Sequence, residues 1–356
     1  IATSLNSGTS VTVDTSNNTG PGAAASGLGN ITISGNISKT AGAATTLTLN
    51  AANWIAGTGN IGSAGNLLTA VFNTSASAAQ GIYSGVISGN VSLSKLGAGA
   101  LTLSGTNNYS GATNLSAGNL TVSGTGKLGS GNYLGALTVG VGTNFNWQST
   151  SAQSLSNIAG AGTFTASASS GTLTINGTQT FTGTYNFAQA VNVSGGTNSS
   201  TSGLGTASAI NINNGGNVSL GPTNNSFLGY SPNATSTLVT IYTGGTLYSP
   251  TSATNTYHLG RLTLAGGTLA SGASYNSTFG SYLLNQGVTV TADSTISALG
   301  VITVNNAVTI NPGKTLTVNG TFTDYSGSVQ SLTLAGGGIL VLAGNNTYTG
   351  ATTISA

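Results

Sequence analysis

Three carboxylates are the only acidic side chains that this chain offers for catalysis: Asp14, Asp293 and Asp324. Glycosidases work with two carboxyl groups a few ångströms apart. Asp293 and Asp324 are 31 residues apart, a spacing that could bring them to neighbouring turns of a repetitive fold. The alternative is that both are solvated turn residues, and the sequence favours this interpretation because nothing else supports a pairing.

His258 is the single histidine, and its neighbours, NTYHLGRL, contain no nucleophile elbow of a catalytic triad. Arg261 and three scattered Asp residues cannot supply both the base and the calcium ligands of a polysaccharide lyase. One His and no Cys exclude a zinc site made of these residues. We therefore predict a protein without enzymatic activity, catalytic residues, metal site or cofactor.

Six of the twelve tyrosines lie between residues 221 and 285, together with three of the five prolines. Exposed tyrosines beside a cation can stack on sugar rings or anchor a protein contact. The alternative is an insertion whose tyrosines pack against the rest of the fold. The candidate contact patch consists of Tyr230, Tyr242, Tyr248, Tyr257, His258 and Arg261.

The chain is almost uncharged, with five basic and three acidic residues among 356. Nucleic-acid binding needs clustered Lys and Arg, which are missing here. No window approaches the ~20 consecutive apolar residues of a membrane-spanning helix. We expect no nucleic-acid partner and no membrane insertion of this segment. The sequence begins at Ile1 without a signal peptide, so we expect a mature product or an excised piece.

A triplet of an apolar residue, Thr and a second apolar residue recurs along the chain. Alternation with period two predicts strands with one buried face. The Gly, Asn and Ser residues between the triplets supply turns, and no stretch shows a helical period with capping signals. Clear copies are Val11–Val13, Ile31–Ile33, Leu101–Leu103, Leu120–Val122 and Leu316–Val318.

The spacing of the triplets distinguishes two all-β folds. Successive triplets are often 16 to 20 residues apart, whereas an antiparallel sandwich or barrel has a strand about every 8 to 12 residues. We predict a parallel β-helix (β-solenoid), a single elongated rod of about 17–19 turns, with the sandwich as the alternative. The expected organisation is solenoid turns over 1–220 and 286–356 around an irregular Tyr/Pro-rich segment or insertion, 221–285.

One phrase of the sequence is repeated: LTLSGTNNYSGATNLSAG from Leu101 returns near the end as LVLAGNNTYTGATTISA. Residues 97–117 align without gaps to 336–356, with 12 of 21 positions identical, and TLTINGTQTFTGTYN is a fainter copy. We interpret the phrase as a turn in which Gly permits the bend and an aromatic ring packs at a corner, its hydroxyl pointing outward. Its structural residues are Gly99, Leu101, Leu103, Gly105, Tyr109 and Gly111, then Leu340, Leu342, Gly344, Tyr348 and Gly350.

This phrase resembles the strand repeat of bacterial autotransporter passenger domains, G-x-L-x-L-x-G-x-N-x-Y-x-G-x-T-x-I-x-x-G. The segments LNSGTSVTVDTS and ITISGNISKTAGAATTLTLNAANWI, within the first 60 residues, are similar to filamentous-haemagglutinin-type adhesins. These resemblances imply a right-handed β-helix on the outer surface of a Gram-negative bacterium. They also imply export by a β-barrel translocator that lies outside this sequence.

The sequence favours an extracellular structural or adhesive protein in which the rod itself is the function. It would be a surface fibre, a sheath or a filament subunit that stacks end to end at an uncapped end near Ala356, or a passenger segment of a longer adhesin. Its partners would be other copies, flanking turns of a longer chain, or surface glycans. The alternatives are a carbohydrate-binding or polysaccharide-degrading β-helix and, more remotely, an ice-binding solenoid with Thr arrays.

Overall fold

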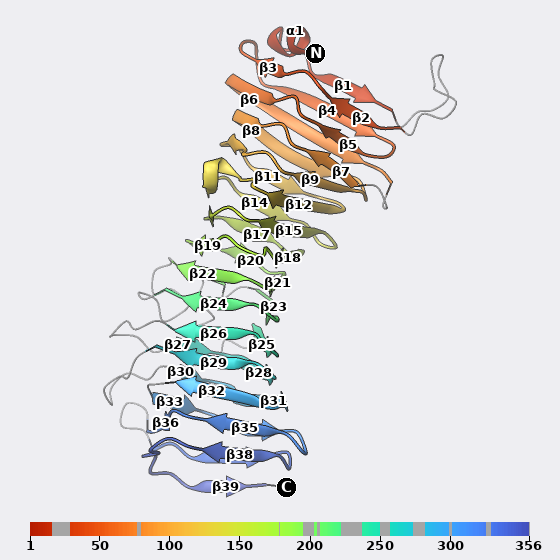
Figure 1. The fold of residues 1–356 in the computed structure, drawn as a ribbon. Helices are drawn as coiled ribbons and strands as arrows, with labels where there is room; N and C mark the ends of the chain where they lie inside the picture. Colours follow the sequence, from red (N-terminus) through yellow and green to blue (C-terminus); the bar gives the residue numbers. More distant parts are fainter. Residues whose placement is uncertain are drawn as a thin grey trace. The chain divides into compact units, whose positions relative to one another are not determined.

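The computed structural model describes residues 1–15, 29–76, 80–177, 179–194, 203–204, 207–221, 237–249, 257–272, 282–298, 301–324 and 329–355. The chain forms two compact units, Ile1–Leu173 and Thr174–Ala356. Within each unit, short strands from successive turns lie side by side in parallel sheets (Figure 1). The predicted parallel β-solenoid is therefore confirmed, and the antiparallel sandwich was the wrong alternative.

Three sheets build the first unit. One consists of β1 (Val11–Asp14), β4 (Thr45–Ala51), β6 (Ile61–Thr74), β8 (Ile87–Leu96), β11 (Thr113–Leu115), β14 (Leu137–Val139) and β17 (Ile158–Gly160), with β3 (Ile37–Lys39) beside β6 and β10 (Asn108–Tyr109) beside β8. The second consists of β2 (Ile31–Ile33), β5 (Ile55–Gly57), β7 (Gln80–Tyr83), β9 (Ala100–Leu103), β12 (Asn119–Gly124), β15 (Asn144–Ser149) and β18 (Thr163–Ala166). The third pairs β13 (Asn132–Tyr133) with β16 (Gln153–Leu155).

Two short helical segments were not predicted from the sequence. Helix α1 (Ala2–Asn6) buries Leu5, and the 3₁₀ turn η1 (Gly129–Gly131) precedes β13. Five residues are too few to produce a recognisable helical period, and α1 has no side-chain cap. The all-β assignment is otherwise correct.

In the second unit β19 (Leu173–Asn176) and β20 (Thr180–Phe181) come first in the sequence, and the later strands that the structure describes lie in three sheets. The longest consists of β21 (Thr184–Phe187), β23 (Ala209–Ile212), β25 (Leu238–Tyr242), β28 (Arg261–Ala265), β31 (Val288–Ala292), β34 (Val308–Ile310), β37 (Leu332–Ala335) and β39 (Thr352–Ile354). The next consists of β22 (Ala190–Ser194), β24 (Asn217–Leu220), β26 (Thr246–Ser249), β29 (Thr268–Ser271), β32 (Ser294–Ala298), β35 (Thr315–Val318) and β38 (Ile339–Leu342). The last consists of β27 (Tyr257–Leu259), β30 (Tyr282–Leu284), β33 (Val301–Val304) and β36 (Thr321–Phe322).

Some turns are longer than the triplet spacing predicted. Ala100 pairs with Asn119, a step of 19 residues, but Ala209 pairs with Leu238, a step of 29. The difference lies in the connections between strands, whose lengths vary while the strands alone carry the alternating pattern. The solenoid therefore has fewer turns than the predicted 17–19.

Inward side chains stack in columns through the core. Leu101, Leu120, Phe145 and Phe164 occupy one register position in four successive turns, and all four are fully buried. The rings of Phe145 and Phe164 lie 5.2 Å apart between centroids. Burial of these apolar side chains holds neighbouring turns together. Truncating one large buried side chain to Ala lowers the free energy of unfolding by about 2–5 kcal/mol.

Polar side chains at matching positions of successive turns form ladders. Asn50 donates Nδ2–H to Asp14 Oδ2 (2.9 Å), and Asn73 donates to Asn50 Oδ1 (2.7 Å). In the second unit, Asn211 donates to Asn186 Oδ1 (2.8 Å). These bonds run parallel to the backbone hydrogen bonds of the sheet. They provide partners for side-chain amides that are half-buried between stacked turns.

Candidate functional site

The two clear copies of the repeat place their leucines in strands of different sheets, β9 and β38. Leu101 and Leu103 point into the core from β9 and are fully buried. Leu340 and Leu342 of β38 stand in register with buried core residues of β35. All four leucines thus stand in register with core residues of a neighbouring turn.

The glycines of the repeat are required for space rather than for an unusual backbone conformation. None of the five has a positive φ angle. A Cβ added at any of them would overlap a backbone carbonyl oxygen of an earlier turn. Their function is therefore close stacking of turns, which differs from the bend that the sequence suggested. The five are Gly99, Gly105, Gly111, Gly344 and Gly350.

Tyr109 is buried, so the expectation that its hydroxyl points outward was wrong. The hydroxyl shares a hydrogen bond with Thr113 Oγ1 (2.6 Å), which also bonds to the hydroxyl of Tyr133 (2.7 Å) on the next turn. Tyr133 donates in turn to the Gly111 carbonyl (2.7 Å). Burial raises the pKa of Tyr133 to about 12. Tyr348 shows the same four-residue spacing, with its hydroxyl 2.8 Å from Thr352 Oγ1.

Asn107 ties three turns together and was seen in the sequence only as part of the pattern. Its Oδ1 accepts the N–H of Ile87 (2.9 Å), one turn earlier. Its Nδ2 donates to the carbonyls of Gly105 (2.9 Å) and Lys127 (3.1 Å), the latter one turn later. In the second copy, Asn346 makes the same bonds to the earlier turn and to its own Gly344.

Two lysines are buried among apolar side chains, which sequence analysis missed. Lys95 in β8 has no exposed surface, and its ammonium donates to the carbonyls of Leu96 (2.7 Å), Gly97 (2.8 Å) and Ala117 (3.4 Å). Burial lowers its pKa to about 8. Lys39 is likewise buried, and its ammonium donates to carbonyls of the turn that follows it.

The exposed part of the predicted contact patch is spread along two neighbouring strands. Tyr242, 41% exposed, ends β25, and the exposed Arg261 begins β28. Tyr242 pairs with Ala265, at the far end of β28 from Arg261. Tyr230 lies outside the described residues. The ring and the cation are therefore not neighbours across the ladder.

The other members of the patch belong to different sheets, β26 for Tyr248 and β27 for Tyr257 and His258. Tyr257 is buried, and its hydroxyl donates to the Gly221 carbonyl (2.8 Å) while its ring lies 6.2 Å from that of Tyr282. Burial lowers the pKa of the half-buried His258. Tyr257 thus packs against the solenoid interior, and a contact role for the others stays a prediction.

The two acids considered as a catalytic pair each bind backbone of a later segment. Asp293 accepts the N–H of Thr315 (2.8 Å). Asp324 accepts the N–H groups of Gln330 and Thr349 and the Thr349 hydroxyl (2.6 Å), and these bonds lower its pKa. Both carboxylates therefore have structural roles in turns. Within the described ranges, no three His, Cys, Asp or Glu residues cluster as metal ligands.

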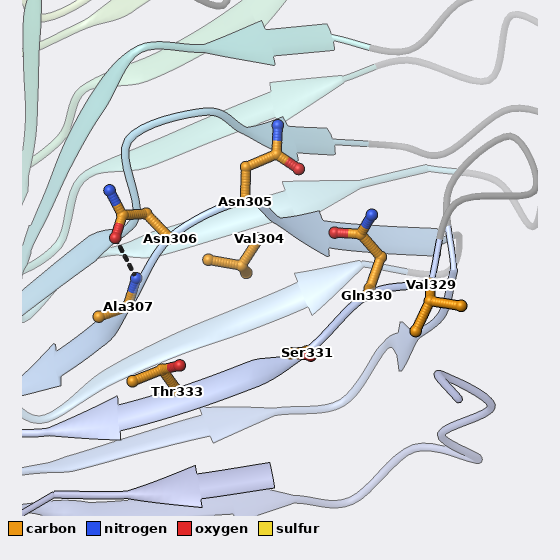
Figure 2. A pocket seen from close by; sticks show the side chains of 8 residues that line it. All are labelled: Val304, Asn305, Asn306, Ala307, Val329, Gln330, Ser331 and Thr333. Atoms are coloured by element: carbon orange, nitrogen blue, oxygen red, sulfur yellow. Dashed lines mark hydrogen bonds between the residues drawn. The ribbon is translucent and has the colours of Figure 1, made fainter. Parts of the chain in front are cut away.

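A pocket of about 430 Å³ opens beside the turn between β33 and β34. Figure 2 shows its wall, formed by that turn and by the segment leading into β37. Among the described residues no charged side chain lines it, and its two parts carry no motif by which sequence analysis could have found it. Its polar lining is Asn305, Asn306, Gln330, Ser331 and Thr333, and Val329 adds an exposed aliphatic side chain.

None of the helices in the described part of the chain is long and apolar enough to span a membrane. Neither the curated proteins nor the solved structures include a significant match to the chain. The similarity of the N-terminal part to filamentous-haemagglutinin-type adhesins is not shown. Residues 93–122 and 332–356 match the family model described as passenger-associated-transport-repeat, so both clear copies of the phrase are similar to the repeats of autotransporter passengers.

Proposed function

We propose that the chain is a non-enzymatic structural segment of an extracellular passenger, which contributes to a surface fibre, a sheath or an adhesin. The matched repeats and the β-solenoid fit an extracellular passenger. The observation that carries the structural role is how the repeat uses its polar groups. Asn107, Tyr109 and Thr113 are fully buried and hydrogen-bond between or within turns.

The neutral surface supports packing against other copies. Thr263, Thr289 and Thr309 are exposed or half-buried and stand in register along the longest sheet of the second unit. Such a column is polar enough to remain hydrated and carries no charge that would repel an identical neighbour. Other copies, or flanking turns of a longer chain, are therefore the partners that we propose.

Negative-stain electron microscopy of the purified chain near neutral pH tests the assembly. Long uniform fibres would support a filament subunit, whereas separate particles would support a passenger segment of a longer adhesin. The extracellular role requires that antibodies against the chain label intact, unpermeabilised cells of the source organism. Labelling only after permeabilisation would overturn it, and release of reducing ends from a polysaccharide panel would overturn the non-enzymatic role.

A further inference from the structure

We propose that the pocket beside the β33–β34 turn, called the amide pocket below, binds a neutral sugar unit. The amide pocket is the site lined by the five polar side chains and Val329 described above. Its volume of about 430 Å³ lies within the range of roughly 300–1,000 Å³ typical of small-molecule sites. A sugar site goes beyond the scaffold role and does not depend on it.

Two asparagines of the pocket are fixed by hydrogen bonds that leave part of each amide available. Asn306 Oδ1 accepts the N–H of Ala307 (2.9 Å), so its Nδ2 remains a donor toward solvent (Figure 2). Asn305 donates Nδ2–H to Asn285 Oδ1 (3.3 Å), so its own Oδ1 remains an acceptor. Sugar hydroxyls donate and accept, which matches this mixture of amide and hydroxyl groups.

The polar groups behind Asn305 are incompletely satisfied. Asn285 has an exposed fraction of 9%, and its Nδ2 has no acceptor within the described residues. A buried donor without a partner costs about 1–3 kcal/mol. Asn285 accepts the Asn305 amide through its Oδ1 and so fixes the orientation in which Asn305 faces the pocket.

Charge and shape select a neutral ligand. The Asp324 carboxylate accepts the N–H of Gln330, a lining residue, and its negative charge disfavours an anionic sugar in the pocket. Val329, 66% exposed, supplies an aliphatic surface for the C–H face of a sugar ring. The described lining contains no aromatic ring, so we expect a dissociation constant of about 1 mM or weaker.

Saturation-transfer NMR and titration calorimetry on the full chain test the proposal, with maltotriose and N,N′-diacetylchitobiose as neutral probes and digalacturonate as the anionic one. At least one neutral probe should bind saturably, and digalacturonate should bind at least about tenfold more weakly. Asn306→Asp keeps the Oδ1 bond to Ala307 but removes the donor, and Thr333→Val removes a hydroxyl at nearly constant shape. Each should weaken binding about threefold to tenfold.

The matched control is Asn157→Asp, the same chemical change at an exposed asparagine of the first unit. It should leave the affinity unchanged, and far-UV circular dichroism should show that all three variants are folded. The proposal is overturned if neither neutral probe binds at about 20 mM. It is equally overturned if Asn306→Asp and Thr333→Val bind as tightly as the parent chain, or if digalacturonate binds best.

Discussion

Lys95 places a positive charge in a core column. It stands in register with Phe72 on the preceding turn and Leu115 on the following one. Its hydrogen bonds go to backbone carbonyls, which hold the ammonium but carry no net charge. Burial disfavours the charged form and lowers the pKa from 10.5 to about 8. This residue should therefore dominate the pH dependence of stability in mildly alkaline solution.

We expect the free energy of unfolding to rise from about pH 8 toward pH 9, below the range in which the tyrosines of the unfolded chain ionise. Folded Lys95 loses its proton near pH 8 while the unfolded chain keeps it to about 10.5, and stability rises wherever the unfolded state binds more protons. Lys95→Met should abolish the rise, as measured by urea denaturation at each pH. The same substitution at the half-buried Lys314 should preserve it. Equal slopes for parent and Lys95→Met would refute this account.

At the scale of the turn, the backbones of neighbouring turns lie so close that some glycine positions have no room for a side chain. A Cβ at Gly111 would overlap the Val91 carbonyl, whereas one at Gly35 would meet nothing within 4 Å. We expect Gly111→Ala to lower the free energy of unfolding by about 1–3 kcal/mol, because backbone must separate from backbone. Gly35→Ala should change it by less than about 0.5 kcal/mol. Chemical denaturation of both variants measures the difference, and equal small effects would show that the turns can spread at no cost.

Strands could be predicted from the sequence because alternation is a local property. The triplet at Leu101–Leu103 coincides with β9. The same alternation places Val91, Leu93 and Lys95 on one face of β8, so it predicts an inward side chain at position 95. The charge of a lysine argues against a buried position, and Lys95 was therefore not predicted as a core residue. The amide pocket could not be predicted, because Asn305 and Gln330 meet only through the stacking of turns whose lengths vary.

At the scale of the whole chain, sparse charge should make stability insensitive to salt. Three carboxylates allow few ion pairs, so we expect the melting temperature to change by less than about 3 °C between roughly 0.05 and 1 M NaCl. Acid should act differently. Hydrogen bonds lower the pKa of Asp324 below 3.8, so its contribution is present above that value and is lost as pH falls through the lowered pKa. Circular dichroism during heating measures both, and a strong salt dependence at neutral pH would contradict the expectation.

The bonds of Asn107 have a mechanical consequence. Its side-chain amide hydrogen-bonds to the backbone of the preceding turn, of its own turn and of the following turn. A force that separates one turn from its neighbours must therefore break side-chain hydrogen bonds on both sides, together with the backbone hydrogen bonds of the sheets. Load is shared across three layers, so around the repeat the smallest unit of rupture is a block of turns rather than a single coil.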